Sequence, residues 1–320
     1  DANASVYSDH VGRKLRVVPR GFPVTIARGG MLGPDNALAF ALKIPANRVP
    51  GSVVSDIAIY PTPMANLTKA LERLLQEPSG CFEQTSSTIY PVIMVQQYFT
   101  SHQGVDAKLV ERGKVLLKNG YERLTGFECK QKGYEWFGQD PGHETLTAYG
   151  LIEFNDMAQV FSVDSGMLQR TRQWVLAARD GKGGFKRERR ALHTWIEDKD
   201  CSNAYITWAL LMAGEPVTSL RAEIDTVKSA AKKSENSYVI AIGANVAVAD
   251  KDTDCAKTLL DRLATKQAKE GFVDGGTMTI VGSGGVALQV ETTAYAVLAW
   301  IQDKNYVGNV EKSLKWLADI

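Results

Sequence analysis

The pentapeptide Gly-Cys-Phe-Glu-Gln at residues 80–84 holds two side chains that could react with each other. The Pro-Ser-Gly sequence at 78–80 ends one helical pattern, and the residues after it predict a new helix with Cys81 near its N-terminus. Residues i and i+3 share a helix face, with Cβ atoms about 5–6 Å apart, so the Cys81 sulfur can reach the side-chain carbonyl of Gln84. Loss of ammonia from this pair would leave an internal thioester, from which an amine or hydroxyl could take the acyl group.

This spacing is compatible with a reactive pair and also with two unlinked residues. A helix N-terminus favours a thiolate, and sulfur is then both a nucleophile and a leaving group. Against this, Cys-x-x-Gln arises often by chance, and a cysteine at a helix start is commonly an ordinary buried residue. The spacing alone does not distinguish the two interpretations, so further features of the sequence are needed.

The pattern of apolar residues changes near residue 62, from one typical of strands to one typical of helices. Residues 1–62 contain short β-branched or alternating runs separated by Gly and Pro turn signals, and they predict a β-rich segment with strands in KLRVV, FPVTIA, ALAFALKI and SVVSDIAIY. From residue 63 to residue 320 the apolar residues recur with helical spacing. We therefore expect two parts, 1–62 and 63–320, and a mainly α fold.

The helical part alternates between two kinds of helix. Segments 203–214, 237–249 and 292–301 are apolar nearly all round, so protein must surround them, whereas their neighbours are amphipathic. A weak repeat accompanies this alternation: Ala-Tyr pairs at 148–149, 204–205 and 294–295 each follow a Gly-aromatic pair, at 133–134, 184–185 and 271–272. Repeated helix pairs stack on their neighbours. The pattern predicts an α/α toroid of about twelve helices, with an irregular helical bundle as the alternative.

Composition excludes several classes of function. A net charge of +1 on 320 residues gives no attraction to nucleic acid or anionic membranes, and no apolar run is long enough to span a bilayer. The cysteines lack zinc-site spacing, so no metal or cofactor is expected. The chain begins at Asp1 without Met, which we interpret as a mature product or an excised fragment. Asn3 and Asn66 lie in sequons that permit glycosylation if the protein is secreted.

Three cysteines remain if Cys81 is reserved for chemistry. They are Cys129, Cys201 and Cys255. One disulfide and one free thiol is the simplest count, and the sequence does not show which two residues pair.

The motif and its approach resemble a known family, the α2-macroglobulin/complement thioester-containing proteins. Their hallmark Gly-Cys-x-Glu-Gln matches residues 80–84, with Gly80 and Glu83 completing the reactive pair, and residues 44–84 resemble the strands and Leu-rich helix before it. The resemblance implies an α/α-toroid thioester domain inserted into a CUB-like domain, whose first part would be 1–62 and whose second half would follow Ile320. Phe82 departs from the Gly of many animal members, which favours a lineage outside vertebrate complement.

A histidine determines the target chemistry in complement members, where it takes the acyl group from sulfur and passes it to hydroxyls. His193 lies eight residues after Phe185, a spacing that resembles this pattern and would imply hydroxyl targets. Its alternative role is an exposed loop residue beside a basic run, Arg187 to Arg190. His143 is the rival candidate, with a capping or packing role expected, and His10 and His102 are expected at the surface.

The resemblance implies a single-turnover protein of innate defence rather than a turnover enzyme. It would be a secreted protein that attaches covalently to hydroxyl or amine groups on cell-surface glycans, proteins or proteases, as an opsonin or a protease inhibitor. The alternative is a helical module that binds receptors or partners, including other domains of its parent chain, with a spent or absent thioester. A glycosidase in this fold would need two carboxylates across a pocket, and Glu144, Glu197 and Asp198 remain open for that role.

Overall fold

The computed structural model describes residues 2–4, 7–9, 12–14, 22, 24–28, 37, 39–57, 59, 71–102, 105–187 and 198–320. The chain divides into two compact units, Asp1–Pro63 and Met64–Ile320. Each unit is described by itself.

In the first unit, the described strands are the short β1 (Ala2–Ala4) and β2 (Tyr7–Asp9), an antiparallel pair with Ala2 opposite Asp9. The strands predicted in FPVTIA, ALAFALKI and SVVSDIAIY are wrong for the described residues of those runs, which form no strand, and of KLRVV only Lys14 is described. The side chains of Val54 and Ile57 are 83% and 91% exposed. An alternating apolar run becomes a strand only with a hydrogen-bonded neighbour and a covering layer, and the described part of this unit supplies neither.

The second unit is helical throughout its described residues. After a helical turn at 71–74, ten α-helices follow, against the twelve or so predicted for the whole chain. They are α2 (Phe82–Ser101), α3 (Ala107–Thr125), α4 (Glu144–Met157), α5 (Ser165–Ala177), α6 (Lys199–Met212), α7 (Arg221–Lys233), α8 (Ser237–Ala249), α9 (Thr253–Thr265), α10 (Gly285–Trp300) and α11 (Val307–Asp319), with 3₁₀ turns η1 (Val217–Leu220) and η2 (Lys304–Tyr306). None of the helices in the described residues is long and apolar enough to cross a bilayer.

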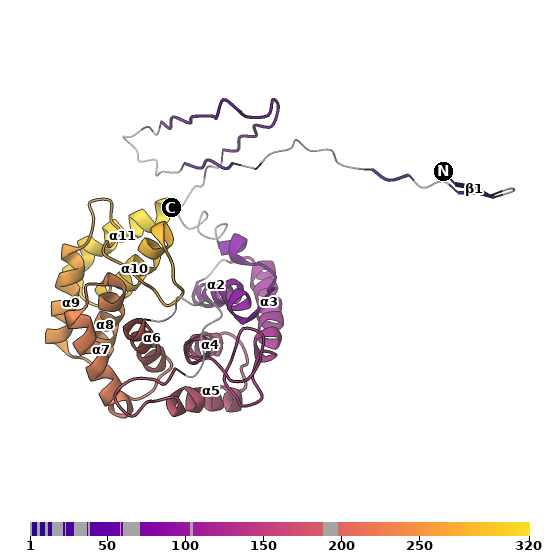
Figure 1. The fold of residues 1–320 in the computed structure, drawn as a ribbon. Coiled ribbons are helices and arrows are strands. Elements are labelled where there is room, and N and C mark those ends of the chain that lie inside the picture. The colour runs from indigo at the N-terminus through magenta and orange to yellow at the C-terminus, as the bar shows by residue number, and fades with distance from the viewer. Residues whose placement is uncertain are drawn as a thin grey trace. The chain divides into compact units, whose positions relative to one another are not determined.

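The even-numbered helices form an inner ring and the odd-numbered helices an outer one (Figure 1). α6 and α8 are buried on almost every side, as their apolar sequences predicted, and so is α4, whereas α3, α7 and α9 bury one stripe. The third apolar segment, 292–301, lies in and just after α10 and is only partly enclosed, because Leu298 and Ile301 are 47% and 60% exposed. Each inner helix packs on the outer helix that follows it, and α2, α4, α6, α8 and α10 pack in succession. This arrangement is the predicted α/α toroid.

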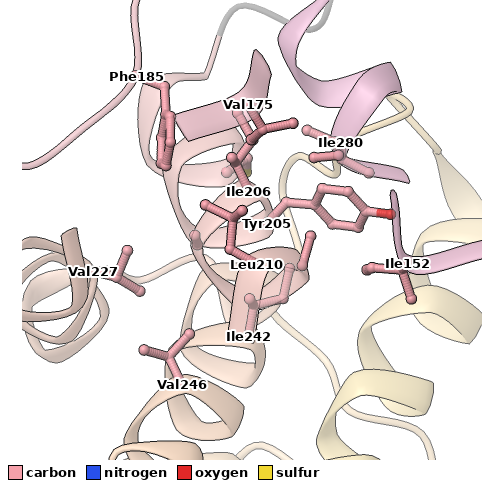
Figure 2. Close-up of a cluster of buried hydrophobic side chains, with 14 of the residues drawn as sticks. Ile152, Val175, Phe185, Tyr205, Ile206, Leu210, Val227, Ile242, Val246 and Ile280 are labelled. Atoms are coloured by element: carbon pink, nitrogen blue, oxygen red, sulfur yellow. The ribbon is translucent and has the colours of Figure 1, made fainter. Parts of the chain in front are cut away.

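Apolar side chains fill the space between neighbouring inner helices. One cluster joins α4, α6 and α8, and Figure 2 shows Tyr205, Ile206 and Leu210 of α6 in this cluster together with Ile152 of α4 and Ile242 of α8. Leu210 and Ile242 have no exposed surface. The packing of this core fixes the spacing of the inner helices.

The sequence repeat corresponds to a repeated structural element. A β-bridge joins Glu128 to Tyr134, Arg179 to Phe185 and Gln267 to Val273, each in the connection between an outer and an inner helix. In every copy a polar side chain one residue before the Ala-Tyr pair accepts the N–H of the second bridge residue: Thr147 for Tyr134 (2.9 Å), Asn203 for Phe185 (3.2 Å) and Thr293 for Val273 (2.9 Å). The repeat is confirmed, but its third copy aligns on Val273 rather than on the predicted Phe272.

The starts of the inner helices are tied to one another through these connections. The Phe82 N–H at the start of α2 donates to the Trp136 carbonyl before α4 (2.9 Å). The thiol of Cys201 in α6 and the amide of Asn236 before α8 both donate to the Met278 carbonyl before α10 (3.5 and 2.9 Å). The N-termini of the inner helices therefore gather at one end of the ring, where the reactive motif lies.

The predicted disulfide is wrong. Cys129, Cys201 and Cys255 are all free thiols, and each is buried in a different place. The Cys129 thiol donates to the Gln139 carbonyl (3.3 Å), Cys201 packs in the core between α4, α6 and α8, and Cys255 packs with α8, α9 and α10. These cysteines behave as small apolar core residues, so counting them could not reveal their state.

Candidate functional site

The site is built on the first turn of α2. Cys81 is the N-cap in an extended conformation (φ −76°, ψ −177°), and the helix begins at Phe82, as predicted. Gln84 is the third helical residue, and its side-chain oxygen Oε1 accepts a hydrogen bond from the Cys81 backbone N–H at 3.1 Å. The Gln84 side chain therefore folds back over the helix start, toward the residue it would react with.

Gly80 makes room for this fold-back. Its φ is +80°, a conformation that residues with a Cβ rarely adopt. A Cβ built on Gly80 would lie 2.0 Å from Oε1 and 2.9 Å from Cδ of Gln84. The side-chain carbonyl of Gln84 therefore rests directly against the Gly80 backbone, which explains physically why glycine precedes the cysteine.

Trp136 holds the start of α2 at two points. Its carbonyl accepts the Phe82 N–H (2.9 Å), and its indole Nε1 donates to Glu83 Oε2 (2.7 Å). The Phe82 ring is fully buried and packs on Tyr134 and Phe127, with ring centroids 5.0 and 6.2 Å away. Phe82 and Glu83 thus anchor the turn, while Cys81 stays half-buried at its end.

His143 is a capping and packing residue, as expected. It is the N-cap of α4, its Nδ1 accepts the Leu146 N–H at 3.3 Å, and its ring lies 4.9 Å from that of Trp136. Only 5% of its surface is exposed. Through Trp136 it supports the reactive turn from the neighbouring helix. His102, by contrast, is exposed and stacks on Tyr98.

His193, the predicted acyl acceptor, lies outside the described residues, as do His10, Glu197 and Asn66. The residues that flank its segment are Arg187 and Asp198, and Arg187 Nη2 donates to the Asp198 carbonyl (3.3 Å) and to Ser202 Oγ (2.8 Å). Arg187 also lines a small pocket together with His143, Glu144, Phe185 and Asn203. The two ends of the His193 segment therefore meet beside the start of α4. Asn3, the other sequon residue, lies in β1 opposite Ser8.

Two of the three candidate glycosidase carboxylates are described, and both lie at the start of an inner helix. Asp198 caps α6 by accepting the N–H groups of Asp200 and Cys201 (2.8 and 3.0 Å), and Glu144 is buried in the first turn of α4. Among the described residues, no group of three or more His, Cys, Asp or Glu side chains could hold a metal ion.

Two residues at the site had no motif to mark them in the sequence. Trp136 could have been suspected, because it follows the Gly133-Tyr134 element by two residues. Arg123 is one of many charged residues on the amphipathic helix α3, and only the folded structure shows that it contacts Gly80 and Thr85.

An α/α toroid that presents a Gly-Cys-x-Glu-Gln turn at the start of an inner helix is the arrangement expected of a thioester domain. Residues 52–319 match the A-macroglobulin TED domain, and the chain belongs to that family. It is also 25% identical over 337 aligned residues to Alpha-2-macroglobulin-like protein 1 of Mus musculus. That alignment covers 98% of this chain and 23% of the mouse protein, so the chain spans about a quarter of the length of this relative.

Proposed function

We propose that Cys81 and Gln84 form an internal thioester through which the protein attaches covalently to its targets. The observation that supports this most is the Gln84 side chain, folded back over Gly80 and accepting the Cys81 N–H at 3.1 Å. In ring formation the Cys81 Sγ bonds to the Gln84 Cδ, the Cδ–Nε2 bond breaks, and ammonia leaves with the thiol proton. An incoming amine or hydroxyl then bonds to Cδ, and sulfur leaves and takes up the proton.

Each molecule would transfer one acyl group, so the protein acts once rather than as a turnover enzyme. We propose that His193 takes the acyl group from sulfur and passes it to hydroxyls, because a neutral imidazole is nucleophilic near neutral pH. The targets would be hydroxyl or amine groups on surface glycans, proteins or proteases outside the cell. Family membership supports this assignment. We also propose that residues 1–62 contain part of a CUB-like domain, although the TED match begins at residue 52.

The thioester predicts a specific mass. The protein expressed from its complete gene should be about 17 Da lighter than its encoded sequence, because ring formation releases one ammonia. Methylamine should add its own mass once, at Gln84, which more than makes up the deficit, and should expose one new thiol at Cys81. Intact-mass spectrometry with thiol labelling measures all three.

Cys81→Ala is the matched control, since it keeps the fold but cannot form the ring. It should show the encoded mass and take up no methylamine. A folded wild-type protein that has its encoded mass and takes up no methylamine would refute the thioester. The alternative function, a helical module that binds partners, would then remain.

The acyl-acceptor role of His193 predicts a change in target preference. In His193→Ala the thioester should still form, but labelling should shift from glycerol toward methylamine by about tenfold or more, since positioned acid–base groups contribute about 10²–10⁴-fold. Competition between the two labelled nucleophiles measures the ratio. His102→Ala, at the exposed residue just after α2, should leave the ratio unchanged, and an equal ratio in His193→Ala and wild type would argue against the imidazole step.

A further inference from the structure

Arg123, on the outer helix α3, holds both flanks of the reactive turn. Its Nη2 donates to the Gly80 carbonyl, and its Nε donates to Thr85 Oγ1 at 3.1 Å. Thr85 Oγ1 in turn donates to the Ser79 carbonyl at 3.2 Å. The guanidinium carbon lies 5.8 Å from the centroid of the Phe127 ring, within the range of a cation–π contact. One side chain therefore joins the residue before Cys81 to the residue after Gln84.

The contact with Gly80 fixes the orientation of the peptide that precedes the reactive sulfur. The Gly80 carbonyl and the Cys81 N–H belong to the same planar trans peptide, so they point in opposite directions. Arg123 donates a hydrogen bond to the Gly80 carbonyl on one side of this peptide, and the Cys81 N–H on the other side donates to Gln84 Oε1 at 3.1 Å. Rotation of this peptide would break both hydrogen bonds together.

The same contact increases the polarity of the peptide. A hydrogen bond from a guanidinium is charge-assisted, and hydrogen bonds in a chain polarise one another. The Cys81 N–H is directed at the oxygen that becomes negative when sulfur attacks Cδ of Gln84. A donor fixed in this position stabilises the developing charge without reorganisation.

We propose that Arg123 is a positioning residue for thioester formation: it orients and polarises the 80–81 peptide so that the Cys81 N–H activates the Gln84 carbonyl. This inference rests on the proposed function. In the step concerned, Sγ bonds to Cδ, the Cδ–Nε2 bond breaks, and ammonia departs with the thiol proton. Arg123 touches none of these atoms and acts through the peptide.

The docking of α3 on α2 does not depend on Arg123. At Gly113 and Gly120 the backbone of α3 lies so close to α2 that a Cβ would come within 2.3 Å of Gln96 Nε2 and 2.4 Å of Ile89 Cδ1. Leu116, Leu117 and Leu124 are buried in the same core. Loss of the Arg123 side chain should therefore affect the chemistry of the turn far more than the stability of the fold.

The test compares two arginines on α3 in the protein expressed from its complete gene. Arg112 also donates to a backbone carbonyl, that of Leu75 at 2.8 Å, but does not touch residues 79–85 in any described contact. We expect Arg123→Gln to lower the rate of ring closure roughly tenfold, because the substitution removes a charge-assisted hydrogen bond, which is stronger than a neutral one. Arg123→Lys should recover part of that rate, and Arg112→Gln should close at the wild-type rate. Mass spectrometry of pulse-labelled protein, by the 17 Da deficit, gives the closed fraction with time, and thermal unfolding reports the fold.

The outcomes are distinct. A folded Arg123→Gln protein that closes as fast as wild type, or equal losses in Arg123→Gln and Arg112→Gln, would overturn the role of Arg123 while leaving the proposed function intact. A wild-type protein that never forms the ring would refute the proposed function and this inference with it. If Arg123→Gln does not fold, Arg123→Lys decides: slower closure at unchanged thermal stability supports the inference, and wild-type closure overturns it.

Discussion

Replacing Phe82 with alanine is expected to lower the free energy of unfolding by about 3–5 kcal/mol, the usual range for a buried phenylalanine. The ring has no exposed surface and packs among the rings of Tyr134 and Phe127. Truncation would leave a cavity beneath the reactive turn. Urea unfolding of the chain, followed by tryptophan fluorescence, measures the change because Trp136 contacts the same turn.

Phe137 provides a matched control, because it lies in the connection that supports the turn but is 59% exposed. Phe137→Ala should change the free energy of unfolding by less than about 0.5 kcal/mol, as surface substitutions usually do. A similarly small change for Phe82→Ala would contradict the full burial of the Phe82 ring.

The space for Phe82 is provided by a glycine on another helix. A Cβ on Gly150 of α4 would lie 2.7 Å from Cζ of Phe82. Gly150→Ala should therefore destabilise the wild-type protein but be tolerated in Phe82→Ala, and a double-mutant cycle should show coupling of about 1–3 kcal/mol. The large residue at position 82 and the small one at position 150 therefore fit each other in this core.

Local patterns predicted the helices and the place of the reactive turn. The change of period after residue 62, the apolar helices and the Pro-Ser-Gly stop all act over a few residues, so the sequence alone contains them. The Ala-Tyr repeat was visible for a similar reason: its preceding polar residue, such as Thr147 or Asn203, closes a hydrogen bond within one repeat.

Features that depend on distant packing could not be predicted. The contact of Phe82 with Gly150 and that of Arg123 with Gly80 join residues 68 and 43 positions apart, and no periodicity links them. The strands expected in 1–62 required hydrogen-bonded neighbours that the described residues of that unit do not contain. The disulfide was inferred from a count of cysteines, but pairing depends on where each thiol is buried.

Glu153 is expected to make the fold less stable as the pH rises. It lies on α4, faces the Ser86 hydroxyl of α2, and is fully buried, with no hydrogen bond of normal geometry to either carboxylate oxygen. Burial, partly offset by Ser86 and reinforced by the charge of Asp156, raises the pKa of Glu153 to about 8. Tyr90 and Tyr149 also lie near this carboxyl group. Burial, the hydrogen bond to Asp156 and the charges of Asp156 and Glu153 raise the pKa of Tyr90, and burial and the charge of Glu153 raise that of Tyr149.

The sign of the effect follows from linkage. Because the folded-state pKa is raised above the ordinary 4.5, the folded state favours the neutral acid. Its contribution to stability is fully present below pH 4.5, is lost progressively as the pH rises toward about 8, and is constant above that. The difference between about 8 and 4.5, at 1.36 kcal/mol per pH unit, corresponds to about 5 kcal/mol.

Glu153→Gln removes this titration while keeping the shape of the side chain. Burying the glutamine amide has a free-energy cost that does not depend on pH. The other titrating groups contribute equally to the free energy of unfolding of both proteins, so their contributions cancel in the difference. The free energy of unfolding of Glu153→Gln relative to wild type should therefore rise by about 4 kcal/mol from pH 4.5 to pH 8.5, most steeply between pH 5 and 8. Urea unfolding at a series of pH values gives this difference. Glu122→Gln, at an exposed position on α3, should show no such rise, and parallel pH profiles for wild type and Glu153→Gln would mean that the buried carboxyl group titrates as it does in water.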